Sequence, residues 1–276
     1  MPTYIVATDL SARGDRAIDR AAMLARQHGA RLVIVHIFDA DLPEEVAAPM
    51  RAKALERLEG FRNEVAAGGE VDCTARVESG DISVDIHDVA EEEGAELLIL
   101  GMHRARPFLD MFRETTLERL VRLGRHPILV VRDPAQKPYA KALVALDFSP
   151  GARRAASLAK DLAPQAERRG FHAVHVPFQS ITDARGEAID TRFYLDAAEA
   201  ELAAWARSEE TSAIAAETDV VEGPVHSVLD REVEKHSPDL LALGAHGRTG
   251  KAPFLLGSFA NDLMRGAPCD LLIARP

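Results

Sequence analysis

The stretch IVATDLSARGDRAIDRAAMLA, from Ile5 to Ala25, is echoed by LVALDFSPGARRAASLAKDLA, from Leu143 to Ala163. Asp9 aligns with Asp147 at a spacing of 138 residues, and the serine two residues after each aspartate aligns as well. In each copy a short apolar run leads through the aspartate into an alanine-rich segment with helical period, which predicts a strand followed by a helix. This self-similarity predicts one structural unit that occurs twice.

A second echo supports the duplication. The segment ELLILGMHR, which ends at Arg104, matches DLLALGAHG, which ends at Gly247. Gly101 therefore aligns with Gly244 at a spacing of 143 residues, and the change of spacing requires only a few inserted loop residues. A chain of 276 residues exceeds the usual size of one domain and accommodates two such units.

The two copies meet at DPAQKP, residues 133–138, which has two prolines and no apolar period and is typical of a linker. This interpretation predicts a first domain over 1–133 and a second over 139–276. Near-continuous apolar runs alternate with amphipathic stretches in both, a pattern typical of a parallel sheet covered by helices on both faces. We therefore expect two tandem doubly wound α/β domains, each with a five-stranded parallel sheet. The expected strands are 4–8, 32–37, 71–77, 97–100 and 128–131, then 142–146, 173–176, 219–221, 240–243 and 271–274, and the expected first-copy helices are 15–28, 44–67, 84–92 and 116–123.

Charge and composition exclude several classes of protein. A net charge of -11 argues against a protein that coats a nucleic-acid polymer or an anionic membrane. No segment reaches about 18 uncharged apolar residues, so no transmembrane helix is expected, and residues 1–10 do not resemble a signal peptide. Cys73 and Cys269 lack CxxC spacing, which favours small core residues in a reducing compartment. We therefore expect a cytoplasmic protein.

Ligands of open α/β sheets bind outside the carboxyl ends of the strands. The residues at those positions are Asp9 and Asp147, after the first strand of each copy, and the loops that begin at Gly101 and Gly244, after the fourth. Both aspartates have a second interpretation, because an acid at the end of a strand commonly caps the next helix.

The glycine loop of the second copy reads GAHGRTGKAPFLLGSFANDLM over residues 244–264. Its glycines allow positive φ and a close approach of backbone amides to a ligand. Ser258 lies where a helical pattern begins, so we expect its hydroxyl to cap a helix whose N-terminus faces an anion. Lys251 and Arg248 either contact that anion or remain in solvent. The loop therefore predicts a phosphate site, although it has neither P-loop spacing nor a GxGxxG fingerprint.

The repeated aspartate, the β/α order and this glycine loop resemble the universal stress protein family, in its tandem form with two domains in one chain. The resemblance extends over essentially all 276 residues. The family's nucleotide motif is Gly, two residues, Gly, nine residues, then Gly followed by Ser or Thr. Gly244, Gly247, Gly257 and Ser258 match it without a mismatch. The resemblance implies a Rossmann-like fold of the adenine nucleotide alpha hydrolase type, with strand order 3-2-1-4-5.

The resemblance also implies a ligand and a role. The ligand is ATP, together with Mg²⁺, bound in the second domain. Asp147 then belongs to the site, the backbone amide of Phe259 faces phosphate, and Val176 lines the adenine pocket. The implied role is that of a stress-response regulatory or protective protein. Last strands of family domains pair with each other, which implies an intrachain pseudo-dimer and association of two chains as a homodimer.

The first copy departs from the motif. Gly101 remains, but the next two glycine positions hold Arg104 and Glu114, and Thr115 takes the serine position. A Cβ where positive φ is required costs about 1 kcal/mol, and a carboxylate beside a triphosphate adds repulsion. We therefore expect no ATP site there, and the arginines of this loop fit either another anion or a solvated surface.

Catalysis and metal binding have no motif. Neither a Ser-His-Asp arrangement nor a carboxylate pair is visible, so no catalytic residue is assigned and slow ATP hydrolysis is the most that is expected. His36 and His175 take nearly equivalent strand ends, but too few other ligand types accompany them to predict a metal site. Trp205 is expected in the core or an interface. Two further functions stay open, a slow ATPase or nucleotide-handling enzyme and a scaffold that works without nucleotide.

Overall fold

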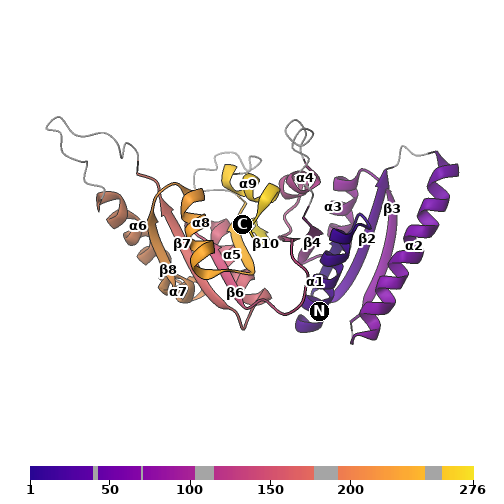
Figure 1. Ribbon diagram of the computed structural model, residues 1–276, viewed down its shortest axis with the longest axis horizontal. Helices are drawn as coiled ribbons and strands as arrows, with labels where there is room; N and C mark the ends of the chain where they lie inside the picture. The colour runs from indigo at the N-terminus through magenta and orange to yellow at the C-terminus, as the bar shows by residue number, and fades with distance from the viewer. Residues whose placement is uncertain (40–42, 70, 103–114, 177–191, 246–256) are drawn as a thin grey trace. The chain divides into compact units, whose positions relative to one another are not determined.

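The computed structural model describes residues 1–39, 43–69, 71–102, 115–176, 192–245 and 257–276, and it confirms the predicted α/β class (Figure 1). The contacts divide the chain into two compact units. The first comprises Met1–Pro138 with Ala252–Ile273, and the second comprises Tyr139–Lys251 with Ala274–Pro276.

The first unit contains a parallel sheet in the order β3-β2-β1-β4-β5, which confirms the expected order 3-2-1-4-5. A sixth strand, β10, pairs antiparallel with β5, with Leu272 opposite Leu129. The elements are β1 (Thr3–Ala7), α1 (Ala12–His28), β2 (Arg31–Asp39), α2 (Glu44–Ala67), β3 (Cys73–Gly80), α3 (Ile82–Glu92), β4 (Leu97–Gly101), α4 (Thr116–Leu123), β5 (Ile128–Val131), α9 (Ser258–Gly266) and β10 (Asp270–Ala274), whose last residue is counted with the second unit.

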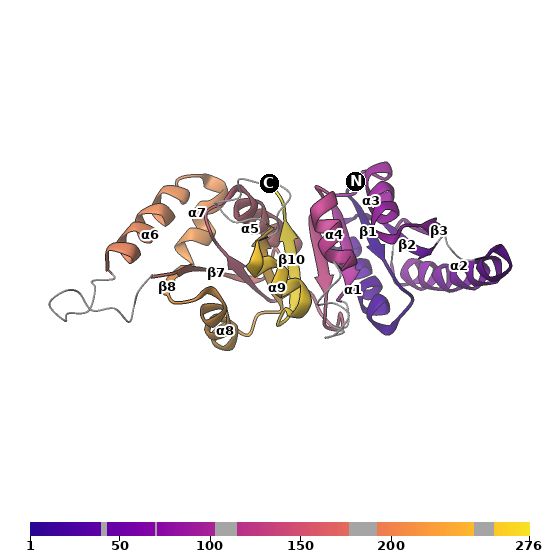
Figure 2. The same cartoon turned by 90° about the horizontal axis from the view of Figure 1, so that it is seen from above.

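Helices cover both faces of this sheet. Helix α1 packs on β1 and β4, whereas α3 and α4 pack on each other, and Figure 2 shows α1 and α3 on opposite sides of β1 and β2. Because both faces are covered, the central strands are fully buried and apolar, as Ile5, Val33 and Ile99 illustrate with no exposed surface. Among the described helices, none has the length and the apolar character that spanning a bilayer requires.

The second unit repeats the pattern with parallel strands in the order β8-β7-β6-β9. Helices α5 and α7 pack together, and Figure 2 shows α8 on the other side of β7 and β8. The elements are β6 (Lys141–Ala145), α5 (Pro150–Leu162), β7 (Glu167–Val174), α6 (Arg192–Trp205), α7 (Glu209–Ala216), β8 (Thr218–Glu222), α8 (Val225–His236) and β9 (Leu240–Gly244).

Two details of the second unit differ from the sequence expectation. The strand expected at 173–176 is β7, which begins six residues earlier because its polar opening, Glu-Arg-Arg-Gly, hides the apolar pattern. The second copy also has two helices, α6 and α7, where the first has α2 alone. The helical structure is interrupted near Ser208, whose hydroxyl accepts a hydrogen bond from Arg153 at 2.6 Å. Thr211 caps the end of α6 by donating to the carbonyl of Trp205 at 2.5 Å.

Candidate functional site

The loop after β6 is held by short hydrogen bonds between neighbours. The carboxylate of Asp147 accepts the backbone N–H of Ser149 at 3.0 Å. The hydroxyl of Ser149 accepts the N–H of Ala152 at 3.1 Å and caps α5, which has Pro150 in its first turn. Ser149, and not Asp147, is therefore the N-cap of α5, and the Asp147 carboxylate instead shapes the turn that precedes this helix.

The first copy has the same turn. Asp9 accepts the N–H of Ser11 at 3.0 Å, and Ser11 caps α1. Burial raises the pKa of the Asp9 carboxyl, but the hydrogen bonds from Ser11 and the nearby Arg13 guanidinium outweigh it, so this pKa lies below its usual value. The aspartate is consequently ionised at neutral pH. Because the turn occurs in both copies, it belongs to the fold and does not by itself distinguish a ligand site.

Between aspartate and serine, each turn holds a bulky residue in the left-handed region. Leu10 has φ 58° and Phe148 has φ 62°, a conformation that costs an L-residue about 1–2 kcal/mol. The ring of Phe148 packs at 4.5 Å from His172 and 6.0 Å from Trp205, measured between ring centroids. Trp205 is 6% exposed, which confirms its expected place in the core.

The structure corrects the pairing of histidines between the copies. In both units, the residue after the last pairing of strand two with strand one is a histidine, His36 or His172. His36 Nδ1 lies 2.8 Å from the carbonyl oxygen of Thr8, and His172 Nδ1 lies 2.6 Å from that of Leu146. His172, and not His175, is therefore the counterpart of His36. Both rings hold the strand end that precedes the aspartate.

Gly244 ends β9 directly against the N-terminus of α5. A Cβ at this position would lie 2.8 Å from the nitrogen of Ala152 and 2.9 Å from the carbonyl carbon of Gly151. Gly101 meets the carbonyl oxygen of Arg13 in the same way, at 2.7 Å. Neither glycine is among the described residues with positive φ. Close packing therefore requires both glycines, and it brings Gly244 beside the helix that follows Asp147.

Val176 lies just beyond β7 and is 5% exposed. It belongs to a small buried cluster with Val174 and with Ala198 of α6. The structure thus places Val176 in the core of the second unit at the carboxyl end of its strand, which is the end where the sequence places the ligand.

Gly257, Ser258 and Phe259 lie in the segment that is counted with the first unit, so the structure describes them apart from Asp147 and Gly244. Gly257 is the N-cap of α9, and Ser258 is already its first helical residue. The expectation that Ser258 caps this helix is therefore wrong, because Ser258 lies one residue after the N-cap position. Gly257 has φ -63°, so positive φ is not the reason for this glycine either.

The N-termini of α4 and α9 differ in charge. Thr115 caps α4, and the carboxylate of Glu118 accepts the N–H of Thr115 at 2.8 Å. Glu118 is 4% exposed and also accepts a hydrogen bond from Arg265 at 2.9 Å. In the second copy Asn261 takes the place of Glu118 at the spacing of 143 residues. Among the described residues, no side chain caps α9 and its first turn contains no acid.

Other predicted residues fall outside the described ranges. They are Gly247, Arg248 and Lys251 of the second glycine loop, and Arg104 and Glu114 of the first.

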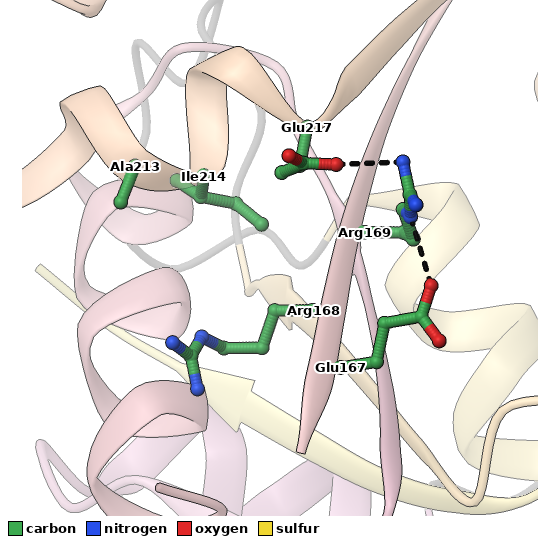
Figure 3. Close-up of a pocket in the computed structure, with 6 residues that line it drawn as sticks. All are labelled: Glu167, Arg168, Arg169, Ala213, Ile214 and Glu217. Carbon is green, nitrogen blue, oxygen red and sulfur yellow. Dashed lines mark hydrogen bonds and ion pairs between the residues drawn. The ribbon is translucent and has the colours of Figure 1, made fainter. Parts of the chain in front are cut away.

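A pocket of about 500 Å³ lies in the second unit at the amino ends of its strands, opposite the end that holds Asp147 (Figure 3). It is lined by the start of β7 and the end of α7, where Glu167 begins its strand. Arg169 lies 2.6 Å from Glu217 and 3.1 Å from Glu167, so the charges of this pocket neutralise one another. It lies at the amino ends of the strands and does not belong to the predicted site.

Sequence reasoning missed Glu118, although a signal for it exists. Residues 115–118 read Thr-Thr-Leu-Glu, the Ser/Thr-x-x-Glu spacing of a capping box. The reciprocal hydrogen bonds of that box are present in the structure.

Comparisons with known proteins agree with these observations. The model of the universal stress protein family matches residues 2–132 and 138–275. A universal stress protein of Mycolicibacterium smegmatis is 24% identical over 292 aligned residues, which cover 99% of this chain and 96% of that protein.

Solved structures show the same fold. A universal stress protein from Archaeoglobus fulgidus has a TM-score of 0.70 at 19% identity, covering 99% of this chain and 98% of that one. A putative universal stress protein from Pseudomonas aeruginosa has a TM-score of 0.68 at 19% identity, covering 100% of this chain and 94% of that one.

Proposed function

Because the chain belongs to the universal stress protein family and carries two of its domains in tandem, we propose that it binds ATP, or a related adenine nucleotide, in its second domain. The protein itself acts in the response to stress, and the bound nucleotide regulates it. The residues assigned to the ligand are Asp147, Val176, Gly244, Gly247, Gly257, Ser258 and Phe259.

The observation that carries this proposal is the contrast between the N-termini of α4 and α9. A helix N-terminus concentrates partial positive charge and attracts phosphate. In the first copy the buried carboxylate of Glu118 already accepts the N–H of Thr115, so this backbone donor is not available to a phosphate. In the second copy the first turn of α9 has no acid, and the complete glycine motif leads into it. Nucleotide binding by the second copy alone follows from this difference.

The turn after β6 favours a ligand contact of Asp147, although the same turn in the first copy means that it does not explain the difference between the copies. Asp147 and Ser149 are hydrogen-bonded to each other, and the chain between them is locked by Phe148 at positive φ. Such a turn presents its carboxylate at a fixed position without further ordering on binding, which favours affinity. Gly244 lies against the same helix, so the start of the glycine loop is fixed as well.

The proposal also includes a metal ion, the assembly of the protein and its location in the cell. Mg²⁺ would accompany the triphosphate and balance its charge. We further propose that the two domains, 1–133 and 139–276, form an intrachain pseudo-dimer, that two chains form a homodimer, and that the protein works in the cytoplasm. These statements rest on the family pattern of tandem domains and on the acidic, cysteine-poor composition.

Replacing Gly257 by glutamate, the residue type of the first copy, tests the site. The φ of Gly257 is compatible with a side chain, so Gly257→Glu is expected to fold. We expect ATP affinity, measured by isothermal titration calorimetry, to fall by at least about tenfold, or about 1.4 kcal/mol, because the new carboxylate repels phosphate.

Gly266→Ala is the matched control, because Gly266 lies in the same helix and a Cβ there meets nothing within 4 Å. Its ATP affinity is expected to equal that of the wild type. Equal, tight binding by wild type and Gly257→Glu would refute the assignment of this loop.

A further inference from the structure

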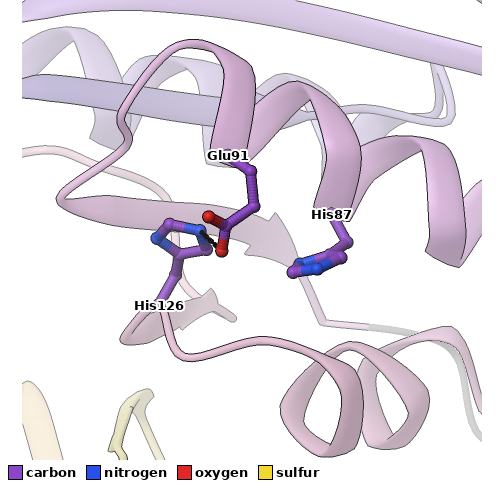
Figure 4. Close-up of side chains that lie close together, drawn as sticks. All are labelled: His87, Glu91 and His126. Carbon is purple, nitrogen blue, oxygen red and sulfur yellow. Dashed lines mark hydrogen bonds and ion pairs between the residues drawn. The ribbon is translucent and has the colours of Figure 1, made fainter.

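Three side chains that can bind a metal lie together in the first unit, apart from the glycine motif (Figure 4). His87 and Glu91 come from α3, and His126 comes from the loop between α4 and β5. One ligand atom of each lies within 4.8 Å of those of the other two. Figure 4 shows His87 and Glu91 directed from their helix toward His126.

The fold explains this gathering. His87 and Glu91 are four residues apart on a helix and therefore share one face. Helices α3 and α4 pack against each other, which brings the loop after α4 beneath that face. His126 precedes β5 and contacts Ala95, which precedes β4. The cluster consequently lies at the amino ends of the strands, opposite the end at which Asp9 lies.

His126 is oriented as a metal ligand. Its Nδ1 lies 2.8 Å from the carbonyl oxygen of Ala95, and because a carbonyl only accepts, Nδ1 carries the proton. Its Nε2 then faces a carboxylate oxygen of Glu91 at 3.1 Å. Either a proton on Nε2 or a metal ion bound to it stabilises this approach of ring nitrogen and carboxylate. A histidine that donates its other nitrogen to a backbone carbonyl is the usual arrangement around bound metal.

His87 supplies an independent observation. Its Nδ1 is buried and, in the part of the chain that the structure describes, has no hydrogen-bond partner. Buried polar atoms of native proteins are nearly always satisfied, so one without a partner points to a group that completes it. The centroids of the His87 and His126 rings lie 6.3 Å apart, with planes inclined by 54°, so the rings approach each other without stacking.

The local charge also favours a cation. Three glutamates, residues 91–93, stand at the C-terminal end of α3, whose last turn has no basic residue. Arg76 pairs with Glu92 and Glu93, so a cation already balances these two carboxylates, whereas the carboxylate of Glu91 lies 3.1 Å from His126 Nε2. A helix C-terminus carries partial negative charge, which adds to that of the carboxylates.

We propose that His87, Glu91 and His126 bind a divalent transition-metal ion, of which Zn²⁺ is the best match. Two imidazoles and one carboxylate are common zinc ligands, and a tetrahedral site with bonds of about 2.0–2.2 Å needs ligand atoms roughly 3.3–3.6 Å apart. The Glu91 side chain is 56% exposed, so water has access to the fourth position. The ion links α3 to the loop between α4 and β5.

A second cluster, Asp219, Glu232 and His236, provides a contrast. The ammonium of Lys235 lies 2.6 Å from Asp219 and 3.6 Å from Glu232. A cation of the protein itself therefore already lies among these carboxylates, and we assign no metal to them.

Zinc titration of the untagged full-length chain, stripped of metal by a chelator, tests the proposal. The wild type is expected to bind one Zn²⁺ per chain in calorimetry, with an excess of Mg²⁺ unable to compete because Mg²⁺ prefers oxygen ligands. His126→Ala and Glu91→Gln are each expected to weaken zinc binding by at least about tenfold. Mutating even a residue that only hydrogen-bonds to a metal ligand typically reduces metal affinity by that much. His236→Ala, the control in the second cluster, is expected to bind like the wild type.

Thermal unfolding supplies a second measurement. Zinc is expected to raise the unfolding midpoint of the wild type and of His236→Ala, and to raise that of Glu91→Gln less at the same zinc concentration, because a ligand stabilises the folded state according to its affinity. Glu91 is exposed, so Glu91→Gln is expected to fold. This variant therefore tests the zinc site even if His126→Ala does not fold. The proposal is overturned if the wild type shows no saturable zinc binding, or if Glu91→Gln binds zinc as tightly as the wild type.

Discussion

Gly101 and Gly244 show how one residue type serves two purposes that a sequence does not separate. Both were expected to mark the start of a ligand loop, and both end a strand directly against a helix N-terminus. The strict requirement at these positions is the absent Cβ, because backbone atoms of the helix lie within 3 Å of where it would be. Predicting this distance needs the packing of strand on helix, which is a tertiary property.

Replacing Gly101 by alanine tests that requirement. The added Cβ would lie 2.7 Å from the carbonyl oxygen of Arg13, so strand or helix must shift. We expect Gly101→Ala to lower the free energy of unfolding by about 1–3 kcal/mol, measured by urea titration. Gly60→Ala, in the middle of α2 where a Cβ meets nothing within 4 Å, is the control and is expected to be neutral or stabilising by up to about 1 kcal/mol. Equal midpoints for the two variants would contradict the packing argument.

At the scale of elements, helix ends were harder to predict than helices. The expected α2 and α4 have the observed bounds, which Pro43 and Gly68 mark for α2 and Thr115 and Gly124 mark for α4. The break between α6 and α7 combines a local feature, the N-cap Ser208 of α7, with a hydrogen bond from Arg153 to Ser208 across 55 residues, which no local pattern contains. The N-cap of α9 was misplaced by one residue, since both Gly257 and Ser258 are suited to that position.

The capping box at the N-terminus of α4 leads to a prediction about stability. Glu118→Asn introduces the residue of the second copy and removes the carboxylate that accepts hydrogen bonds from Thr115 and Arg265. We expect the free energy of unfolding to fall by about 1–3 kcal/mol, measured by urea titration. Arg119→Ala, on the same helix as Glu118, breaks an exposed ion pair with Asp81 at the N-terminus of α3 and is expected to destabilise the protein less. A smaller loss for Glu118→Asn than for Arg119→Ala would argue against the role of Glu118.

At the scale of the whole molecule, the internal repeat carried most of what could be predicted. Two α/β copies, the parallel strands and the strand order of the first unit followed from it and from the family resemblance, and they are confirmed. The ligand assignments remain predictions. What the sequence could not reveal are groupings between distant segments, such as His126 with His87 and Glu91, because their proximity depends on how helices pack.

The number of nucleotides bound per chain tests the central claim that the second copy alone keeps the site. Equilibrium dialysis of the full chain against ATP and Mg²⁺ measures it directly. We expect one ATP per chain in the wild type and, at an ATP concentration that just saturates the wild type, clearly less than one in Gly257→Glu. Two ATP per chain in the wild type would contradict it by showing a second nucleotide site, and one ATP that persists in Gly257→Glu would contradict the assignment of the second copy's loop.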